Sequence, residues 1–377
     1  MTDQEGLPSE SAPTLFASAA PHIRDRASIP QIMYSVNGAL IPALIGAIVI
    51  FGMRAAWLVL MSIVSALATE WAIQKLRKIP VTINDGSAIL TGLLLAFNLP
   101  AGVPIWIPIV GSVFAVAIGK QVFGGLGYNP LNPALLGRAF LMASWPVHMT
   151  KDWLNPFWWT QANFHFFSWG VHSPGSSRLV DTVTGATPLE IFKTARGVLL
   201  DSSSSPDKIL AASDSMNSVL SSAKALFLGN VGGCIGETSA LLLLLGAIFL
   251  LYRRVIGWKI PLSYLFTVAI LAWVFSGTDG LFSGDPLFHI LSGGVVLGAF
   301  FMATDLVTTP ITHWGKIIFG TGCGVITIII RLVGGYPEGC SYSILLMNLT
   351  TPLLDRYTLP RRFGLKPMKM KLREVTS

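Results

Sequence analysis

One polar run outside the hydrophobic segments carries the residue types that could hold a reactive group. It reads Asp181-Thr-Val-Thr-Gly-Ala-Thr-Pro-Leu-Glu190. Thr187 offers a hydroxyl, Pro188 after it cannot donate a backbone hydrogen bond, and Glu190 offers a carboxylate. The function of this run therefore depends on whether the Thr187 hydroxyl only forms hydrogen bonds or is also joined covalently to another group.

The spacing of these residues is typical of a helix start. Thr187 as N-cap, Pro188 at the first helical position and Glu190 three residues after the cap make a capping box, and apolar residues follow. The same position suits a phosphate, because free backbone N–H groups and the positive end of the helix dipole converge there. A helix cap and a phosphate site do not exclude each other.

The run also resembles a known modification site. Asp181-x-x-Thr184-Gly185-Ala186-Thr187 is similar to the Asp-x-x-(Ser/Thr)-Gly-Ala-Thr signature at which a flavin transferase joins FMN to a threonine through a phosphoester. The Pro-Leu pair that follows is similar to that of the RnfD protein of the Rnf electron-transport complex and of the related NqrB protein of the sodium-pumping NADH:quinone reductase.

Further runs resemble the same family and occur in family order over nearly the whole chain. They are Pro21-His-Ile-Arg24, Val81-Thr-Ile-Asn-Asp-Gly-Ser87, Gly119-Lys-Gln-Val-Phe-Gly-Gly125, Asn129-Pro-Leu-Asn-Pro133, Gly236-Glu-Thr-Ser239, Met302-Ala-Thr-Asp305 and Gly334-Gly-Tyr-Pro337. The chain is therefore identified as a member of the NqrB/RnfD family. The match along the chain and the short N-terminus are more similar to the Rnf protein than to the quinone reductase protein.

The resemblance implies a covalent flavin. Thr187 would carry FMN as a phosphoester on the outer face of the membrane. Gly185 and Ala186 would keep the site small enough for the transferase to approach, while Asp181 would help its recognition and Thr184 completes the motif. No residue is assigned a catalytic role, because the isoalloxazine performs the electron transfer.

The resemblance also implies an enzyme complex, an ion-translocating ferredoxin:NAD+ oxidoreductase. It would couple electron transfer between reduced ferredoxin and NAD to the movement of Na+ or H+. The expected partners are the other Rnf subunits (A, B, C, E and G), ferredoxin and NAD through those subunits, a flavin transferase and membrane lipids. Similar proteins also suggest a second flavin, riboflavin, between two repeats. The chain has no G-x-G-x-x-G strand-to-helix motif of its own, so it must work with partner subunits.

The composition predicts a membrane protein independently of this resemblance. Of the 377 residues, 52% are hydrophobic and only 12% are charged, and the mean hydropathy is +0.62. The net charge of +7 does not indicate a nucleic-acid partner, because basic residues cluster between hydrophobic segments and at the C-terminus, as the positive-inside rule expects. We predict an all-α, multi-pass protein of the cell (inner) membrane.

Cysteines and histidines give no support for metal or haem chemistry. Cys234, Cys323 and Cys340 lie far apart without C-x-x-C spacing, so they cannot form a four-thiolate iron–sulfur cluster or a structural zinc site within this chain. We expect these cysteines to pack in the core. The histidines form no facing pair at helical spacing on one apolar segment, so no metal is predicted.

Hydrophobic segments predict about ten membrane crossings. They lie at 32–52, 55–74, 88–99, 104–119, 135–147, 240–252, 260–275, 287–303, 317–333 and 343–354. The segment 88–99 is short and stops at Pro100, which favours a broken or half-length helix. Basic residues at 75–78, at 253–254 and in the C-terminal tail mark the cytoplasmic side, so both termini are predicted inside.

This pattern divides the chain into parts. They are a cytoplasmic N-terminal tail at 1–31, a first transmembrane repeat at 32–147, an extracytoplasmic segment with the flavin motif at 148–225, a second transmembrane repeat at 226–355, and a basic cytoplasmic tail at 356–377. The outer segment begins with tryptophans and phenylalanines, which suit a membrane interface or stacking on an isoalloxazine. A helix to Leu200 and a flexible linker at 201–207 are expected within it.

Two stretches suggest that the repeats are related. Leu94-Leu-Ala-Phe-Asn98-Leu-Pro100 before the fourth span resembles Phe301-Met-Ala-Thr-Asp305-Leu306 before the ninth. Repeats of five crossings each must lie in opposite orientation, because an odd number reverses the second copy. We therefore predict two inverted five-helix repeats with broken helices, in which Asn98 and Asp305 are pseudo-equivalent.

Ionisable residues within or near the predicted membrane are few, and each is a candidate for function because burying an unpaired charge is expensive. They are Glu70, Asp85, Arg138, Glu237, Asp305 and Arg331. We single out Glu237 and Asp305, with Asn98, as residues of an ion path or flavin pocket. The structural alternatives are a helix N-terminal acid for Glu237 and a turn acid for Asp305.

Two other functions compete with the redox subunit. Inverted repeats with broken helices are also typical of a small-solute channel or transporter. A scaffold that only docks redox partners is the third interpretation. The Thr187 motif separates them, because neither a channel nor a scaffold needs a flavin attached to an outer loop.

Overall fold

The computed structural model describes residues 28–157, 186–201, 205–237, 239–278, 280–336 and 338–359. Within these ranges every regular element is a helix, and one isolated bridge pairs Pro100 with Cys234. The prediction of an all-helical protein is confirmed for this part of the chain. Most of the two predicted tails and most of the aromatic part of 148–225 lie outside the described residues, whereas α1 begins at Ile29 and α16 ends at Tyr357, a few residues inside the predicted tails.

The first group of helices follows the predicted segments closely. It contains α1 (Ile29–Phe51), α2 (Met53–Leu76), η1 (Ile83–Asp85), α3 (Ser87–Phe97), α4 (Trp106–Val116) with its π-helical end η2 (Ala117–Gln121), α5 (Pro133–Ser144) and α6 (Pro146–Thr150). A capping box of Ser28 and Gln31 starts α1. Helix α3 has 11 residues, which confirms the predicted half-length helix.

The second group of helices contains α11 (Ala240–Tyr252), α12 (Lys259–Phe275), α13 (Pro286–Leu291), α14 (Val295–Leu297) with the π-helical turn η4 (Gly298–Met302), α15 (His313–Val333) and α16 (Cys340–Tyr357). Helices α8 (Pro188–Leu200), α9 (Pro206–Leu220) and α10 (Ala223–Leu228) precede it in the chain. The prediction for 240–252 matches α11 at both ends.

The prediction of one continuous crossing at 287–303 is wrong. Helix α13 ends at Leu291, and the backbone is irregular at Ser292 and at Gly293, which has a φ of 65°. Two adjacent glycines permit this break, and a neighbouring helix satisfies the carbonyl groups that the break frees. The Arg331 side chain on α15 donates to the oxygens of His289 (2.6 Å) and Ser292 (2.9 Å).

The segment 201–225 contains more structure than the predicted linker. Helix α9 begins at Pro206, inside that linker, and packs along α8. Its buried face consists of Ala212, Met216 and Val219, at the spacing of one helical stripe. The stripe was missed because two of its members are small or medium-sized residues among serines and aspartates.

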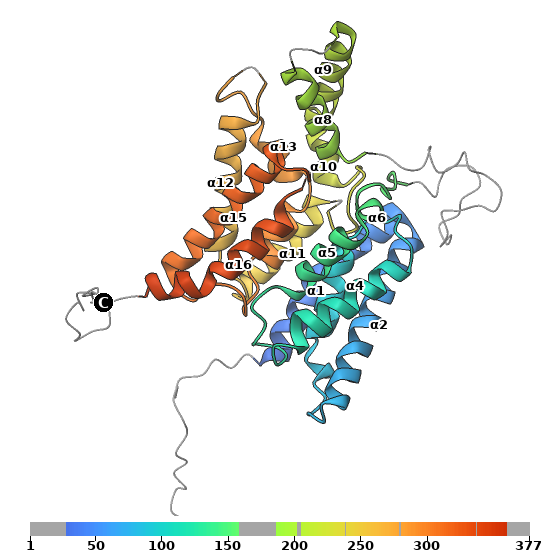
Figure 1. Cartoon of the computed structure of the whole chain (residues 1–377), viewed down its shortest axis with the longest axis vertical. Coiled ribbons are helices and arrows are strands. Elements are labelled where there is room, and N and C mark those ends of the chain that lie inside the picture. Colours follow the sequence, from blue (N-terminus) through green and yellow to red (C-terminus); the bar gives the residue numbers. More distant parts are fainter. Residues whose placement is uncertain are drawn as a thin grey trace, which may run out of the picture.

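The two groups of helices lie side by side (Figure 1). Helix α1 packs against α11, and α5 contacts α16. The α8–α9 pair projects from one end of the molecule, while the start of α1 and the end of α16 lie toward the opposite end (Figure 1). The α8–α9 pair therefore lies away from both described chain ends (Figure 1).

In the part of the chain that the structure describes, three helices are long and apolar enough to cross a membrane: α1, α2 and α15. Helix α1 presents Ile41, Ile45 and Val49 on one stripe, and each of these side chains is at least 50% exposed. An apolar stripe of this kind on the outside of a bundle suits contact with lipid rather than with water. Together with the shorter apolar helices, it indicates a membrane protein.

The α1–α11 crossing depends on a glycine. A Cβ atom on Gly246 would overlap the carbonyl oxygen of Ala39, whereas a Cβ on Gly38 of α1 would meet nothing within 4 Å. We expect Gly246→Ala to lower the free energy of unfolding by about 1–3 kcal/mol through overpacking. Gly38→Ala is the matched control and should leave it unchanged or raise it. Thermal unfolding of both variants in detergent tests this, and equal melting temperatures would contradict it.

Candidate functional site

Thr187 caps helix α8, as its sequence context predicts. Its backbone is extended, with φ −70° and ψ 151°, and its hydroxyl accepts a hydrogen bond from the Glu190 N–H at 3.3 Å. The Thr187 side chain is buried, while Ala186 before it is exposed. The other motif residues, Asp181, Thr184 and Gly185, lie outside the described residues.

Contacts with the second group of helices hold α8 in place. The ring of Phe192 lies 5.1 Å from that of Phe288 on α13. Lys193 donates to the carbonyl oxygens of Gly334 and, at 3.4 Å, Tyr336. These contacts fix the N-terminus of α8 next to the loop between α15 and α16.

A small cavity lies beside Thr187. Its volume is about 20 Å³, and its wall includes Thr187, Gly232, Gly293, Glu237 and Glu338. A cavity needs roughly 10–15 Å³ to hold one water molecule. The cavity is therefore large enough for water and too small for a flavin ring.

A larger cavity also borders Glu338. Its volume is about 320 Å³, which falls within the range of roughly 300–1,000 Å³ for small-molecule sites. Its wall is partly aromatic and partly charged: Trp153, Glu190, Tyr336, Tyr342, Arg138 and Glu338 belong to it. The rings of Tyr336 and Tyr342 are stacked with centroids 5.7 Å apart. Glu338 lines both cavities and so joins the Thr187 surroundings to the larger space.

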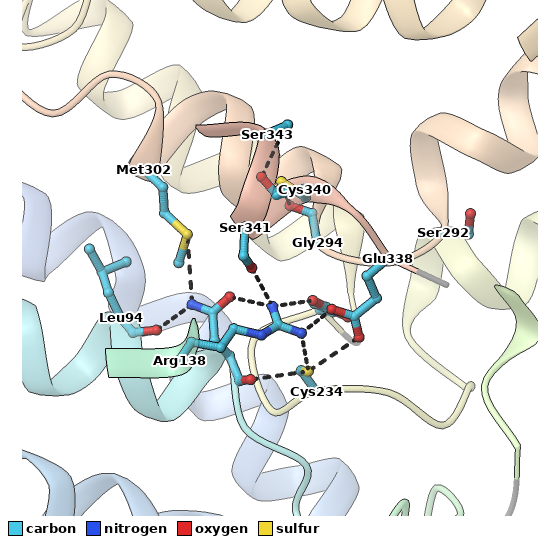
Figure 2. Close-up of polar contacts among 12 residues, drawn as sticks. Leu94, Arg138, Cys234, Ser292, Gly294, Met302, Glu338, Cys340, Ser341 and Ser343 are labelled. Carbon is cyan, nitrogen blue, oxygen red and sulfur yellow. Dashed lines mark hydrogen bonds and ion pairs between the residues drawn. The ribbon is translucent and has the colours of Figure 1, made fainter. Parts of the chain in front are cut away.

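Arg138 on α5 is the centre of a buried cluster of polar side chains (Figure 2). Its guanidinium donates to Asn98 Oδ1 at 2.8 Å and to Ser341 Oγ at 2.9 Å. It forms ion pairs with Glu338 and, at 3.8 Å, with Glu237. Because α5 and Asn98 belong to the first group of helices and Glu338 and Ser341 to the second, the cluster connects the two groups.

The loop before α11 is held in place by the end of α3. The Ile235 N–H donates to Leu99 O at 3.0 Å, and the Gly236 N–H donates to Phe97 O at 2.9 Å. Any side chain on Gly236 would overlap the Phe97 ring. This close approach places Glu237 beside Arg138.

A thiol and two carboxylates come together in this cluster. One ligand atom each from Cys234, Glu237 and Glu338 lies within 4.8 Å of the others. The Arg138 guanidinium contacts all three groups, including the Cys234 sulfur at 3.8 Å. The arginine thus supplies the positive charge that a metal ion would bring, and the donors fit an arginine-centred cluster better than a metal site.

Glu237 is placed unusually tightly against the break in the second group of helices. Its Oε1 atom is buried and has no hydrogen-bond partner among the described residues, although it lies 3.8 Å from Arg138 Nη1. A Cβ on Gly294 would lie 2.6 Å from this oxygen. The break at Gly293 and Gly294 therefore makes room for the carboxylate.

Asp305 lies away from this cluster. Its carboxylate accepts from the Val307 N–H at 3.4 Å and from Thr308 Oγ1 at 3.3 Å, as a turn acid would. It lines a cavity of about 70 Å³ between the two groups of helices, together with Asn129 and Lys120. Of the three predicted residues, Asn98 and Glu237 share one site, and Asp305 belongs to another.

A buried ion pair beside the cavity of about 70 Å³ was not predicted. Lys120 in η2 lies 2.8 Å from both carboxylate oxygens of Glu70 on α2, and it also contacts Ser87 Oγ at 2.6 Å. Both charged side chains are 1% exposed. Asp85, another predicted candidate, accepts from the Ser87 N–H at 2.8 Å and so fixes the start of α3.

Sequence reasoning also missed Glu338. It lies in a short loop between two hydrophobic segments, where an acid is usually an exposed loop residue. One signal could have pointed to it: Arg138 is a cation within an apolar segment, and a buried cation needs a carboxylate partner somewhere in the fold.

The apolar helices and the charged centre between them define a helical membrane protein. The family model described as NQR2, RnfD, RnfE matches residues 16–364, so the chain belongs to that family.

Relatives match over nearly their whole length. The RnfD-type protein of a "Na(+)-translocating ferredoxin:NAD(+) oxidoreductase complex" from Acetobacterium woodii is 49% identical, covering 94% of this chain and 97% of the relative. Its counterpart from a "Proton-translocating ferredoxin:NAD(+) oxidoreductase complex" of Clostridium ljungdahlii is 46% identical, covering 92% and 95%. The counterpart from an "Ion-translocating oxidoreductase complex" of Stutzerimonas stutzeri is 40% identical, covering 90% and 93%.

Proposed function

We propose that this chain is the electron-transfer membrane subunit of an ion-translocating ferredoxin:NAD+ oxidoreductase complex and that it carries FMN covalently on Thr187. The observation that carries the proposal is the position of Thr187. Its hydroxyl lies at the N-terminus of α8, and Glu338 joins its surroundings to a cavity of about 320 Å³. The names of the relatives support the complex.

The residues around Thr187 suit an attached flavin phosphate. The positive end of the α8 dipole would stabilise the phosphate, while Pro188 has no N–H and the Glu190 N–H already donates to Thr187. The larger cavity offers Trp153, Tyr336 and Tyr342 for contact with a planar ring, and Arg138 and Glu338 for polar contacts. FMN, when attached, accepts and passes on electrons, and the protein holds it and adjusts its electrostatic surroundings.

The proposed topology has about ten crossings in two inverted repeats. The contacts of the two groups are similar. In the first group the second helix, α2, packs on α4, and in the second group the second helix, α12, packs on α15. The third element is short in one group and broken in the other. The proposed topology puts the start of α1 and the end of α16 on the cytoplasmic side and the α8–α9 pair outside, which agrees with their positions toward opposite ends of the molecule (Figure 1).

The proposal includes a second flavin and a coupling ion. Riboflavin would lie between the repeats, and the cavity there, of about 70 Å³, would have to widen to hold it. Asn129 and Asp305 in its wall are its candidate polar contacts. The ion is Na+ or H+, since relatives of similar identity are named for each. The other Rnf subunits (A, B, C, E and G) would complete the complex.

The test is the intact mass of the full-length chain produced together with an active flavin transferase. We expect the wild type to gain one FMN less water and to fluoresce in a denaturing gel, and Thr187→Val to do neither. Thr187→Asn is the sharper variant, because asparagine caps a helix as well as threonine but has no hydroxyl to form the phosphoester. Thr187→Ser retains both properties and should be labelled.

Two outcomes would overturn this proposal. An unmodified wild type alongside an active transferase would leave Thr187 as a helix cap only and would favour the channel or scaffold functions. Labelling of Thr187→Asn would show that the flavin is attached elsewhere.

A further inference from the structure

Glu338 holds a position that no other described acid shares. It lines the small cavity at Thr187, it lines the larger cavity, and its carboxylate forms an ion pair with Arg138. Its backbone oxygen accepts from Arg331 Nε at 3.0 Å. The residue is therefore fixed at both its main chain and its side chain, with the side chain 13% exposed.

The Arg138–Glu338 pair brings opposite charges to the wall of the larger cavity. The Arg138 side chain is 4% exposed, so water screens its charge poorly. Of the two carboxylate partners, Glu338 accepts a hydrogen bond from the guanidinium, whereas Glu237 lies 3.8 Å away and lines only the small cavity. The charge felt inside the larger cavity thus depends first on whether Glu338 neutralises Arg138.

We propose that Glu338 is a positioning residue that keeps the reduction potential of the Thr187-linked flavin low, by neutralising and orienting Arg138 at the wall of the flavin cavity. The inference rests on the proposed attachment of FMN to Thr187. It goes beyond that attachment, because it assigns the tuning of the flavin to an acid 151 residues further along the chain, counted as 338 minus 187.

The sign of the effect follows from charge alone. Reduction of the flavin adds negative charge to the cavity, which the Glu338 carboxylate opposes and an uncompensated Arg138 guanidinium favours. Replacing Glu338 by the neutral glutamine removes the opposing charge and releases the arginine. The flavin then becomes easier to reduce, and its potential becomes more positive.

A second carboxylate gives an internal comparison. Glu237 pairs with the same arginine at 3.8 Å but lines only the small cavity, so its charge acts on the larger cavity from further away. Glu237→Gln should move the potential in the same direction by a smaller amount. Asp285, which caps α13 and lines neither cavity, is the charge-matched control, because Asp285→Asn makes the same change of charge and keeps the cap.

The experiment is a potentiometric titration of the full-length, FMN-loaded chain in detergent, followed by flavin absorbance, with intact mass measured on the same samples. We expect Glu338→Gln to shift the potential to a more positive value. Glu338→Asp keeps the charge and should keep the potential close to that of the wild type. Asp285→Asn should not shift it. A purely structural role would make the aspartate and glutamine variants behave alike.

The outcomes separate this inference from the proposed function. If Glu338→Gln carries FMN by mass but titrates as the wild type does, the role of Glu338 is overturned and the proposed function stands. If the wild type carries no FMN, both fall. If Glu338→Gln aggregates, Glu338→Ser, which removes the same charge with a smaller side chain, takes its place in the titration: a positive shift supports the inference, and an unchanged potential overturns it.

Discussion

Replacing Arg138 by methionine is expected to destabilise the folded chain by about 3–5 kcal/mol, the usual cost of removing one partner of a buried ion pair. The substitution leaves the Glu237 and Glu338 carboxylates facing each other without a positive charge between them. It also removes the hydrogen bonds to Asn98 and Ser341 that connect the two groups of helices. Denaturant titration of the full-length chain in mixed micelles measures the change.

Two further variants show whether charge is the cause. Arg138→Lys retains the charge but cannot reach all five partners of the guanidinium at once, so it should lose some stability, though less than the methionine variant. Combining Arg138→Met with Glu237→Gln and Glu338→Gln removes every charge of the cluster and should restore part of the loss. If the triple variant is less stable than Arg138→Met alone, the explanation by unpaired carboxylates is wrong.

Lys120→Met is expected to cost a similar amount, about 3–5 kcal/mol, at the opposite end of the helices. Lys120 and Glu70 are both 1% exposed, so the carboxylate cannot regain hydration when its cation is lost. The substitution also removes the hydrogen bond that Lys120 donates to Ser87 Oγ at the start of α3, which leaves that hydroxyl its bond to Asp85 Oδ1. We expect α3 to loosen, which accelerated backbone hydrogen exchange in α3 would detect.

The matched control replaces both members of the pair. Lys120→Met combined with Glu70→Met leaves no buried charge in the pair, and apolar replacements of buried pairs are often neutral or stabilising. The double variant should therefore be more stable than Lys120→Met. Equal stabilities of the single and double variants would mean that the unpaired carboxylate is not the source of the loss.

The two ion-pair sites share a structural task. Arg138 secures the loop before α11 and the end of α3, and Lys120 secures the start of α3. Irregular backbone within a membrane is tolerated only where protein groups satisfy it. Buried cations in neighbouring helices thus make the short and broken helices possible, and the short helix α3 borders the cavity of about 70 Å³.

Much of the fold could be predicted from local sequence. Segments of apolar residues predicted α1, α2, α11 and α12 to within a few residues, because membrane helices are determined by length and hydropathy. The Thr-Pro-x-Glu order predicted the start of α8, because a helix cap is formed by neighbours in the chain. The family could be recognised for a similar reason, since its motifs are contiguous runs.

Local sequence did not predict the break at Gly293. Two glycines and a serine inside an apolar segment are tolerable in a continuous helix, and the sequence does not show that Arg331 would satisfy the freed carbonyls. Helix α9 was missed for a related reason. Its buried face is visible only once α8 lies against it.

By itself the sequence determined that this is a helical membrane protein with a threonine at the start of a helix outside the hydrophobic segments. Only the tertiary structure decided which charges meet: Arg138 pairs with Glu338 across 200 residues of sequence and with Asn98 across 40. The physical reason is the separation along the chain of the residues that interact. Hydropathy and capping depend on neighbours along the chain, whereas the pairing of a buried charge depends on which helices pack together and on the absence of water between them.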